Sequence, residues 1–332
     1  MSENSSLLSR YLYDGLRTEI LFHAVKLNIV DHLLKEPMSV KDLAQTIQAH
    51  PPSLDRFLRY LVLFGIIECK DGIFSVTSLG SLLSEDHEEG VKYQYLMVSN
   101  YAMKAAQHLD HTIRTGGVAL EHALGMQVFD YMKQHPEDNE LFLKMVKKHS
   151  KMFARQLLSV YDFSPFKHIV DVGGADGALL IEILKSTPNA QGTLFDLLPV
   201  AEEAAKMIAE NKLSERCKTA GGSFFDSLPV VGDCYILKHV LHDWNDEKCE
   251  QILRNVGKSM APESKLLIME SILAPVDYVF QMIDFMMWIQ TDGKERSISD
   301  FETLLKSADF KISRLITIPP GKYTIIETVL NK

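Results

Sequence analysis

Two acidic residues end successive predicted strands, where a small ligand could bind. The first strand runs into the glycine-rich segment 171–177, and the second ends at Asp196. Glycines let the backbone turn tightly and approach a ligand, and a carboxylate after the second strand can accept both hydroxyls of a ribose. The dinucleotide pattern G-x-G-x-x-G is broken, because Ala175 and Ala178 replace two of its glycines. The segment therefore favours a ligand with an amine and a nucleoside over a pyrophosphate.

A histidine and two glutamates could carry out general-base chemistry. His242 lies in a His-Asp-Trp segment, and an imidazole with a pKa of about 6.5 can accept a hydroxyl proton near neutral pH. Glu270 ends an apolar strand, where a carboxylate needs a partner. Glu295 lies in a charged run that by itself predicts solvated surface. From the residues alone, His239 competes with His242 for the role, and each could be an ordinary structural histidine.

The elements that position these residues begin at residue 167. Short apolar runs alternate there with helical periodicity, which predicts a doubly wound α/β domain with a parallel sheet covered on both faces. Ligands bind such sheets at the carboxyl ends of the strands. The last two predicted strands, 312–318 and 323–330, have no helix between them, so they can pair antiparallel around the turn 319–321.

Nearly all of the first 160 residues have helical periodicity. Apolar spacing between residues 7 and 34 predicts one long helix or two short ones, and Ser39 is a candidate N-cap of the next helix. The segment 65–76 predicts two strands around an Asp-Gly turn. We therefore predict a mainly helical, winged-helix domain over residues 1–160 and an α/β domain over residues 161–332.

The winged-helix pattern has two interpretations, DNA binding and a structural or dimerisation role. The predicted recognition helix, 53–64, carries only Arg56 and Arg59 as cations, beside Asp55. The formal net charge of the chain is −9, which disfavours binding to phosphate backbones and anionic lipids. The sequence thus favours the dimerisation role and predicts no nucleic-acid or membrane partner.

Composition narrows the classes of protein to which the chain could belong. With 332 residues, 46% hydrophobic and 24% charged, the chain has the profile of a globular protein with about two domains. Its four cysteines form no C-x-x-C pair, so neither a zinc ribbon nor a disulfide framework is indicated. The first residues lack the pattern of a secretory signal, and no apolar stretch is long enough to span a bilayer. We expect a cytoplasmic protein.

Six motifs follow one another in an order that resembles a known enzyme family. They are DVGGADG, FDLLPV, AGGSFFDSLP, YILKHVLHDWNDEKC, LLIMESIL and DGKERSISDFETLLKSADF. The family is that of the S-adenosylmethionine-dependent O-methyltransferases of the plant caffeate and acetylserotonin type, which also occur in bacterial secondary metabolism. The resemblance covers essentially the whole chain. It implies a Rossmann-like class I methyltransferase sheet, a winged-helix dimerisation domain, a homodimer, and methyl transfer from S-adenosylmethionine to a hydroxyl of a small, aromatic acceptor.

The resemblance also implies roles by position. The catalytic residues are the base His242, its flanking acids Glu270 and Glu295, and the weaker candidate Asp243. Asp171, Gly173 and Gly174 match residues that hold the methionine end of the cofactor, and Asp196 with Leu197 matches the ribose clamp. The remaining cofactor candidates are Ser150, Lys238, Ser223 and Phe224. The acceptor candidates are Phe129, Phe142, Met286 and Gln290.

Two residues depart from the family pattern. Ser223 stands where the family has an aspartate that binds the adenine amine, so this contact must come from a hydroxyl, a water or Asp226, with Phe224 packing on the ring. Ala175 replaces the third glycine, which alanine tolerates comfortably only if its φ is negative.

No metal is expected, because a sulfonium is already an electrophile and the transfer needs mainly proximity and alignment. Two other functions stay open. A cofactor-binding relative could catalyse hydroxylation, decarboxylation or pericyclisation, although the complete set of His242, Glu270 and Glu295 favours base chemistry. A winged-helix regulator is disfavoured by the negative charge. The sequence predicts neither the acceptor nor the choice between oxygen, nitrogen and sulfur.

Overall fold

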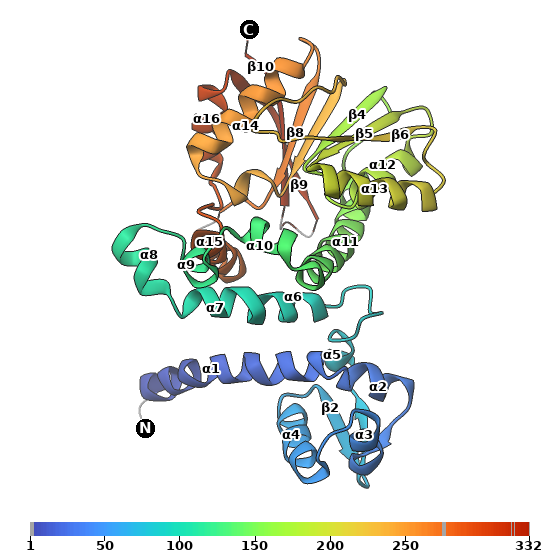
Figure 1. Ribbon diagram of the computed structural model, residues 1–332, viewed down its shortest axis with the longest axis vertical. Coiled ribbons are helices and arrows are strands. Elements are labelled where there is room, and N and C mark those ends of the chain that lie inside the picture. The colour runs from blue at the N-terminus through green and yellow to red at the C-terminus, as the bar shows by residue number, and fades with distance from the viewer. Residues whose placement is uncertain (1–2, 274–276, 320, 322, 332) are drawn as a thin grey trace. The chain divides into compact units, whose positions relative to one another are not determined.

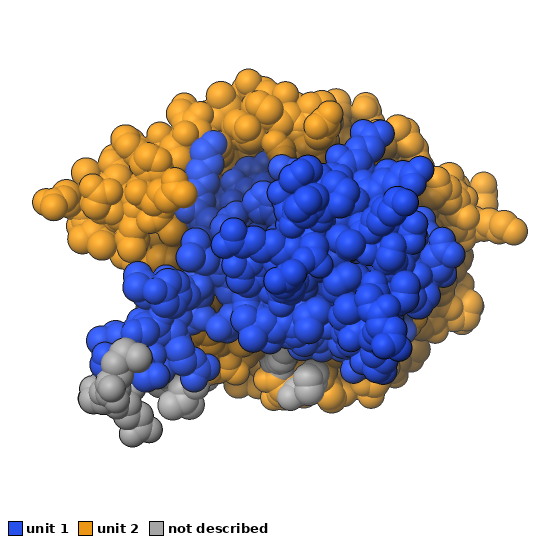
Figure 2. Space-filling model, turned by 90° about the horizontal axis from the view of Figure 1, so that it is seen from below, with its two compact units in different colours: residues 1–104 blue, residues 105–332 orange. Residues whose placement is uncertain are grey.

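The computed structural model describes residues 3–273, 277–319, 321 and 323–331, and the chain divides into two compact units, Met1–Lys104 and Ala105–Lys332 (Figures 1 and 2). The change from helical periodicity to alternating strands and helices predicts a division after residue 160, whereas contacts group the helices of residues 109–158 with the sheet that follows them. The compact units and the predicted domains are therefore different divisions. Among the described residues, no helix combines the length and apolarity needed to cross a bilayer.

Unit 1 is mainly helical and contains a small antiparallel sheet of strand order β1-β3-β2. Its elements are α1 (Glu3–Lys26), α2 (Ile29–Lys35), β1 (Met38–Ser39), α3 (Val40–Thr46), α4 (Pro51–Leu63), β2 (Ile67–Lys70), β3 (Ile73–Val76), α5 (Ser78–Ser81), α6 (Lys92–Met97) and the π-helical turn η1 (Val98–Ala102). The periodic segment 7–34 forms two helices rather than one, because Asn28 adopts a left-handed conformation with φ of 53° between them.

The winged-helix prediction is confirmed in its details. Strands β2 and β3 pair antiparallel, and both residues of their turn, Asp71 and Gly72, have positive φ, which matches the twist of a hairpin. Ser39 caps α3, since its hydroxyl accepts a hydrogen bond from the Asp42 amide at 3.3 Å. Helix α1 also exposes large apolar side chains to 60–72% of their surface, namely Leu8, Tyr11, Leu12, Tyr13 and Leu16.

Unit 2 places a seven-stranded sheet between helices. Helix α7 (Met103–Ala106) crosses from unit 1 into unit 2. The elements that follow are α8 (Leu109–Thr115), α9 (Ala119–Leu124), α10 (Val128–Gln134), α11 (Pro136–Leu158), β4 (His168–Val172), α12 (Ala178–Ser186), β5 (Gln191–Asp196), α13 (Leu198–Glu210), β6 (Cys217–Gly221), β7 (Cys234–Lys238), the 3₁₀ turn η2 (Leu241–Asp243), α14 (Asp246–Ser259), β8 (Lys265–Glu270), α15 (Tyr278–Gln290), α16 (Ile298–Ser307), β9 (Phe310–Ile318) and β10 (Tyr323–Leu330).

The strand order of the large sheet is β6-β5-β4-β7-β8-β10-β9. The first five strands in this order are parallel, and β10 pairs antiparallel with both β8 and β9. The predicted doubly wound sheet and its final hairpin are confirmed, although Pro320 of the predicted turn lies outside the described residues. Strand β6 was not among the predicted strands, because this edge strand buries only Cys217 fully and lacks an apolar run.

Alternating side chains of the central strands enter two separate cores. Ile169, Leu194 and Ile236 pack with α11, α12 and α13, whereas their neighbours Val170 and Phe195 pack on the other face with α14 and α16. Figure 1 shows α12 and α13 on one side of the sheet and α14 and α16 on the other. This alternation follows from the two-residue period of a strand. Between β4 and β7 the strand order reverses, and ligands bind such sheets at this point.

Candidate active site

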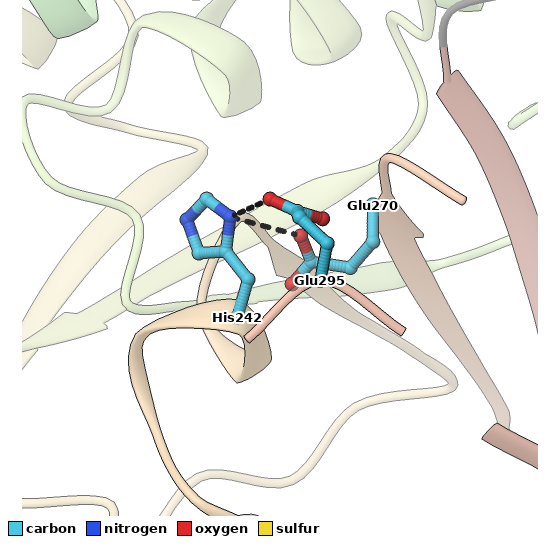
Figure 3. Close-up of side chains that lie close together, drawn as sticks. All are labelled: His242, Glu270 and Glu295. Atoms are coloured by element: carbon cyan, nitrogen blue, oxygen red, sulfur yellow. Dashed lines mark hydrogen bonds and ion pairs between the residues drawn. The ribbon is translucent and has the colours of Figure 1, made fainter. Parts of the chain in front are cut away.

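His242 and two glutamates meet beyond the carboxyl ends of β7 and β8. Figure 3 shows both carboxylates turned toward the same ring nitrogen. His242 Nδ1 lies 2.9 Å from Glu295 Oε1 and 3.7 Å from Glu270 Oε2. On the other side of the ring, Nε2 is 3.7 Å from Asp243 Oδ1, too far for a hydrogen bond. The contact with Glu295 thus orients the ring through Nδ1 and leaves Nε2 available for another hydrogen bond.

Glu270 is fully buried at the end of β8, and the backbone of the next turn satisfies one of its oxygens. Its Oε1 accepts hydrogen bonds from the Val240 and Leu241 amides at 3.1 and 3.0 Å. Its Oε2 has no hydrogen-bond partner among the described residues. Glu270 therefore holds the backbone leading into η2 and also places negative charge beside His242.

Burial and the neighbouring charges shift the pKa values of His242, Glu270 and Asp243. Burial acts to lower the pKa of His242, but the carboxylates of Glu270, Asp243 and Glu295 outweigh it and raise that pKa to about 10. Burial also raises the pKa of Glu270 to about 7 and that of Asp243 to about 6, against the attraction of His242. The protonated imidazole is therefore strongly favoured, and the neutral ring is a strong base.

The same side chains have donor atoms suited to a cation. His242, Glu270 and Glu295 each offer one ligand atom, and these atoms lie within 4.8 Å of one another. Imidazole and carboxylate are ordinary zinc ligands. These three side chains therefore form a candidate cation site as well as a candidate base.

A second group of predicted residues surrounds the glycine turn after β4. A Cβ at Gly174 would lie 2.8 Å from Asp171 Oδ2, and a Cβ at Gly173 would lie 2.9 Å from a methyl group of Val240. Both glycines thus keep a narrow space open. Asp171 is 2% exposed, and its Oδ2 has no hydrogen-bond partner among the described residues. A buried carboxylate oxygen of this kind suits the ammonium group of a ligand.

Asp171 and Lys238 are electrostatic partners at the ends of adjacent strands. Burial raises the pKa of Asp171 to about 7, with Lys238 opposing the shift and Asp196 and Asp176 adding to it. Burial lowers the pKa of Lys238 to about 8. Lys238 Nζ donates to the buried hydroxyl of Ser150 at 3.1 Å. The structure therefore brings three predicted cofactor residues, from α11, β4 and β7, to one place.

Asp196 ends β5 beside the glycine turn. Its Oδ2 accepts from the Ala175 amide at 2.9 Å, and its Oδ1 accepts from the Leu197 amide at 2.7 Å. Ala175 has a φ of 50°, so this alanine adopts the left-handed conformation that a glycine would adopt without strain. The condition of a negative φ at this position is therefore not met. Leu197 is 38% exposed beside the carboxylate.

Ser223 and Phe224 follow β6. Ser223 Oγ accepts from the Phe225 amide at 3.2 Å, which engages the hydroxyl in its own turn. A Cβ at Gly173 would meet the ring of Phe224 at 3.7 Å, so this ring borders the glycine turn. Phe224 thus lies where ring packing on a nucleoside is feasible, while Asp226 is exposed.

Two of the four acceptor candidates line a small cavity beside η2, the turn that contains His242. The cavity measures about 90 Å³, and its lining includes Phe129, Gln290 and Trp244. Trp244 directly follows the His242–Asp243 pair, and its ring centroid lies 6.0 Å from that of Phe129. Phe142 and Met286 are half-buried and do not line this cavity.

Sequence reasoning missed one carboxylate of the glycine turn. Asp176 Oδ1 accepts from the Ala178 amide at 3.1 Å, and its buried Oδ2 has no partner among the described residues. Its position inside the glycine-rich segment 171–177 could have identified it as a candidate cofactor residue. The competing base candidate, His239, stacks on His242 with ring centroids 5.3 Å apart, and burial holds its pKa well below the ordinary value.

Comparisons with known proteins match nearly the whole chain. The O-methyltransferase domain family matches residues 106–311, and the O-methyltransferase dimerisation domain family matches residues 10–86. A phenazine O-methyltransferase of Lysobacter antibioticus is 35% identical over 96% of this chain and 94% of its own length. A mitomycin biosynthesis 6-O-methyltransferase of Streptomyces lavendulae is 31% identical over 92% of this chain and 88% of its own length.

A solved structure with its ligands bound is also similar. The O-methyltransferase NcsB1 of neocarzinostatin biosynthesis, in complex with S-adenosylmethionine and 2-hydroxy-5-methyl naphthoic acid, has a TM-score of 0.83 and 28% identity. The match covers 95% of this chain and 96% of that chain. The resemblance found in the sequence and the expected cofactor are thus confirmed.

Replacing Ala175 by glycine should stabilise unit 2. Removing the Cβ relieves the left-handed strain, and part of this gain is offset by the freer unfolded chain, so the expected net gain is about 1 kcal/mol. Both tryptophans of the chain lie in unit 2, so denaturant unfolding followed by tryptophan fluorescence reports on this unit. Ala201→Gly, inside α13, is the control and should lose about 1 kcal/mol. Equal destabilisation by both variants would show that Ala175 is not strained.

Proposed function

The chain belongs to the S-adenosylmethionine-dependent O-methyltransferase family, and from this premise we propose that His242 is the general base that deprotonates a small aromatic acceptor. The observation that carries the proposal is the 2.9 Å contact between His242 Nδ1 and buried Glu295. It fixes the tautomer with its proton on Nδ1, so that Nε2 has the lone pair.

His242 Nε2 takes the proton of the acceptor hydroxyl as that oxygen becomes nucleophilic. Bound S-adenosylmethionine would supply the methyl group from its cationic sulfur, with the carbon–sulfur bond breaking as the bond to the acceptor oxygen forms and neutral S-adenosylhomocysteine as the leaving group. Glu295 and Glu270 stabilise the imidazolium that forms, because both carboxylates lie within 4 Å of Nδ1. Because they raise the pKa of His242, the rate should rise as pH increases and the ring loses its proton.

The residues around the glycine turn fit the chemical groups of this cofactor. Asp171 offers its unpartnered oxygen to the amine of the methionine end, and Asp196 has lone pairs left for the ribose hydroxyls. Gly173 and Gly174 keep the space between them free of side chains. Lys238 with Ser150 supplies a cation and a hydroxyl suited to a carboxylate.

The acceptor is proposed to be a small aromatic compound bound beside Trp244. Phe129 and Trp244 give the neighbouring cavity an aromatic lining, and Gln290 supplies a polar group that can orient a ring substituent. The named relatives act on phenazine and mitomycin compounds, and the ligand of NcsB1 is a naphthoic acid. These names are consistent with a planar acceptor.

Metal-free transfer is part of the proposal. His242 Nδ1 is engaged by Glu295, and the positive charge that activates the methyl group resides on the cofactor itself. A cation held by the two glutamates and Nδ1 of His242 would displace the proton through which Nδ1 contacts Glu295.

A homodimer formed through unit 1 is also proposed. The dimerisation domain family covers residues 10–86, and Leu8, Leu12 and Leu16 form an exposed apolar row at four-residue spacing on α1. Such a face is stabilised by packing against a second copy of the chain.

Replacing His242 by alanine should lower kcat by about 100- to 10,000-fold, the usual contribution of a general base. We would measure methyl transfer from labelled S-adenosylmethionine to a panel of phenols and aromatic acids, with and without EDTA. Cofactor affinity should stay within about twofold, since the ring does not line the glycine turn. EDTA should leave the wild-type rate unchanged.

His168→Asn is the matched control, because His168 bonds to Thr193 where β4 begins, at the far end of the strand from the site. An active His242→Ala variant would remove the base assignment. Loss of wild-type activity in EDTA, restored by Zn²⁺ or Mg²⁺, would instead contradict metal-free transfer.

Affinity for the cofactor product should increase from pH 6 to pH 8. The carboxylate form of Asp171 binds an ammonium group, and its pKa of about 7 leaves much of the side chain protonated at pH 6. Calorimetry with S-adenosylhomocysteine should show this rise in the wild type. Asp171→Asn should bind about 10- to 100-fold more weakly and lose the rise, as expected when a charged hydrogen bond is lost.

Asp162→Asn, at an exposed loop carboxylate, controls for the change of charge. If Asp171→Asn retains both the affinity and its pH dependence, Asp171 does not hold the amine.

Leu12→Asp with Leu16→Asp should convert a dimer into a monomer. Two buried carboxylates without partners would oppose association strongly. Sedimentation velocity on the wild type and the double variant measures the oligomeric state. Val231→Asp is the control, because Val231 is as exposed as Leu12 but lies in unit 2. A wild-type monomer, or a double variant that still dimerises, would contradict the proposed interface.

A further inference from the structure

His242 and Glu295 lie far apart in the sequence, and their segments must be held together. His242 stands in η2, a turn of only three residues, and Glu295 stands in the connection between α15 and α16. Misplacing a reacting group by about 1 Å can cost about 100-fold in rate. The 2.9 Å contact between their side chains therefore needs support from the surrounding backbone.

Arg296 provides this support by binding backbone carbonyls on both sides of the His242–Asp243 pair. Its side chain is 1% exposed. Nη1 donates to the carbonyl oxygen of Leu241 at 2.8 Å, and Nη2 donates to that of Trp244 at 2.9 Å. Leu241 precedes His242, and Trp244 follows Asp243. One guanidinium group thus bonds to the chain immediately before and after the His242–Asp243 pair.

Asp246 fixes the guanidinium group from the first turn of α14. Its Oδ1 accepts from Arg296 Nε at 3.0 Å and from Nη2 at 2.7 Å. Lys294 Nζ donates to its other oxygen at 2.6 Å. The buried positive charge of Arg296 is therefore paired, and both Arg296 and Lys294 join the Glu295 segment to the start of α14.

The backbone of the Glu295 segment also contacts the turn directly. A Cβ at Gly293 would overlap the carbonyl oxygen of His242, so only glycine permits this approach. On its other side, Arg296 forms a bridge with Ile272, and its carbonyl oxygen accepts from the Leu273 amide at 3.0 Å. The segment is thus held between η2 and the chain that follows Glu270.

We infer that Arg296 is a positioning residue. It sets the distance between His242 and Glu295 by binding the carbonyls of Leu241 and Trp244, on either side of His242 and Asp243. The inference rests on the proposed role of His242. A planar guanidinium group can reach two carbonyls and a carboxylate at once, whereas the single ammonium group of lysine cannot reproduce this fork. Arg296→Lys should therefore keep the charge and lose the alignment.

The test compares Arg296→Lys with the wild type in kcat, KM, cofactor affinity and the pH dependence of kcat. We expect kcat to fall about 10- to 100-fold while KM and cofactor affinity change by less than about threefold. The rising limb of kcat with pH should move to lower pH, because Glu295 no longer holds a proton on His242 as strongly. Asp246→Asn should lower kcat and move its rising limb to lower pH by smaller amounts. This variant provides the test if Arg296→Lys does not fold.

Arg216→Lys is the matched control, because Arg216 also binds three backbone carbonyls in unit 2, those of Leu184, Thr187 and Ala190. If losing the fork of hydrogen bonds only destabilises the fold, both Arg296→Lys and Arg216→Lys should have a lower unfolding temperature. Neither should then move the rising limb of kcat with pH. Arg296→Lys with wild-type kcat and an unmoved limb would overturn the inference. An active His242→Ala variant would overturn the proposed base instead, so the two failures are distinguishable.

Discussion

The burial of one imidazole among three carboxylates is the constraint on which this end of the sheet depends. An unpaired charge cannot be buried at tolerable cost, so each carboxylate must have a donor or a cation within reach. Glu270 uses the amides of Val240 and Leu241, and Glu295 uses His242. The carboxylates stabilise the protonated imidazole, and Nδ1 keeps its proton against Glu295 while Nε2 is the atom proposed to exchange a proton with the acceptor.

The sheet topology makes this cluster possible beside the glycine turn. Because β7 lies between β4 and β8, Lys238 at the end of β7 lies between Asp171 with the glycine turn, on β4, and Glu270 at the end of β8. The cationic Lys238 separates the two acidic groups, and its pKa is lowered by the burial that the site requires. The proposed cofactor residues and the proposed catalytic residues thus lie at one edge of one sheet, at the ends of different strands.

Local sequence patterns predicted both hairpins and every strand of the large sheet except β6, because these depend on period, turn residues and neighbouring side chains. They could not predict the burial of Glu295 and Arg296. Both belong to a charged run whose partners, His242 and Asp246, lie about fifty positions away. The positive φ of Ala175 was also beyond prediction, since it follows from the bond to Asp196. The family resemblance supplied the role of Glu295, which the physical pattern alone did not indicate.

Strand β10 has a consequence for the order in which the molecule is made. It follows β9 along the chain, yet it lies between β8 and β9 in the sheet. On the ribosome, β8 therefore emerges with an open hydrogen-bonding edge, and β9 cannot join the sheet until residues 323–330 have been synthesised. Tyr323 at the start of β10 bonds to His149, and its ring packs against His239 beside the catalytic turn. A nascent chain that ends before residue 323 thus contains all the proposed catalytic residues but lacks the strand that joins β8 to β9 and the Tyr323 side chain beside η2.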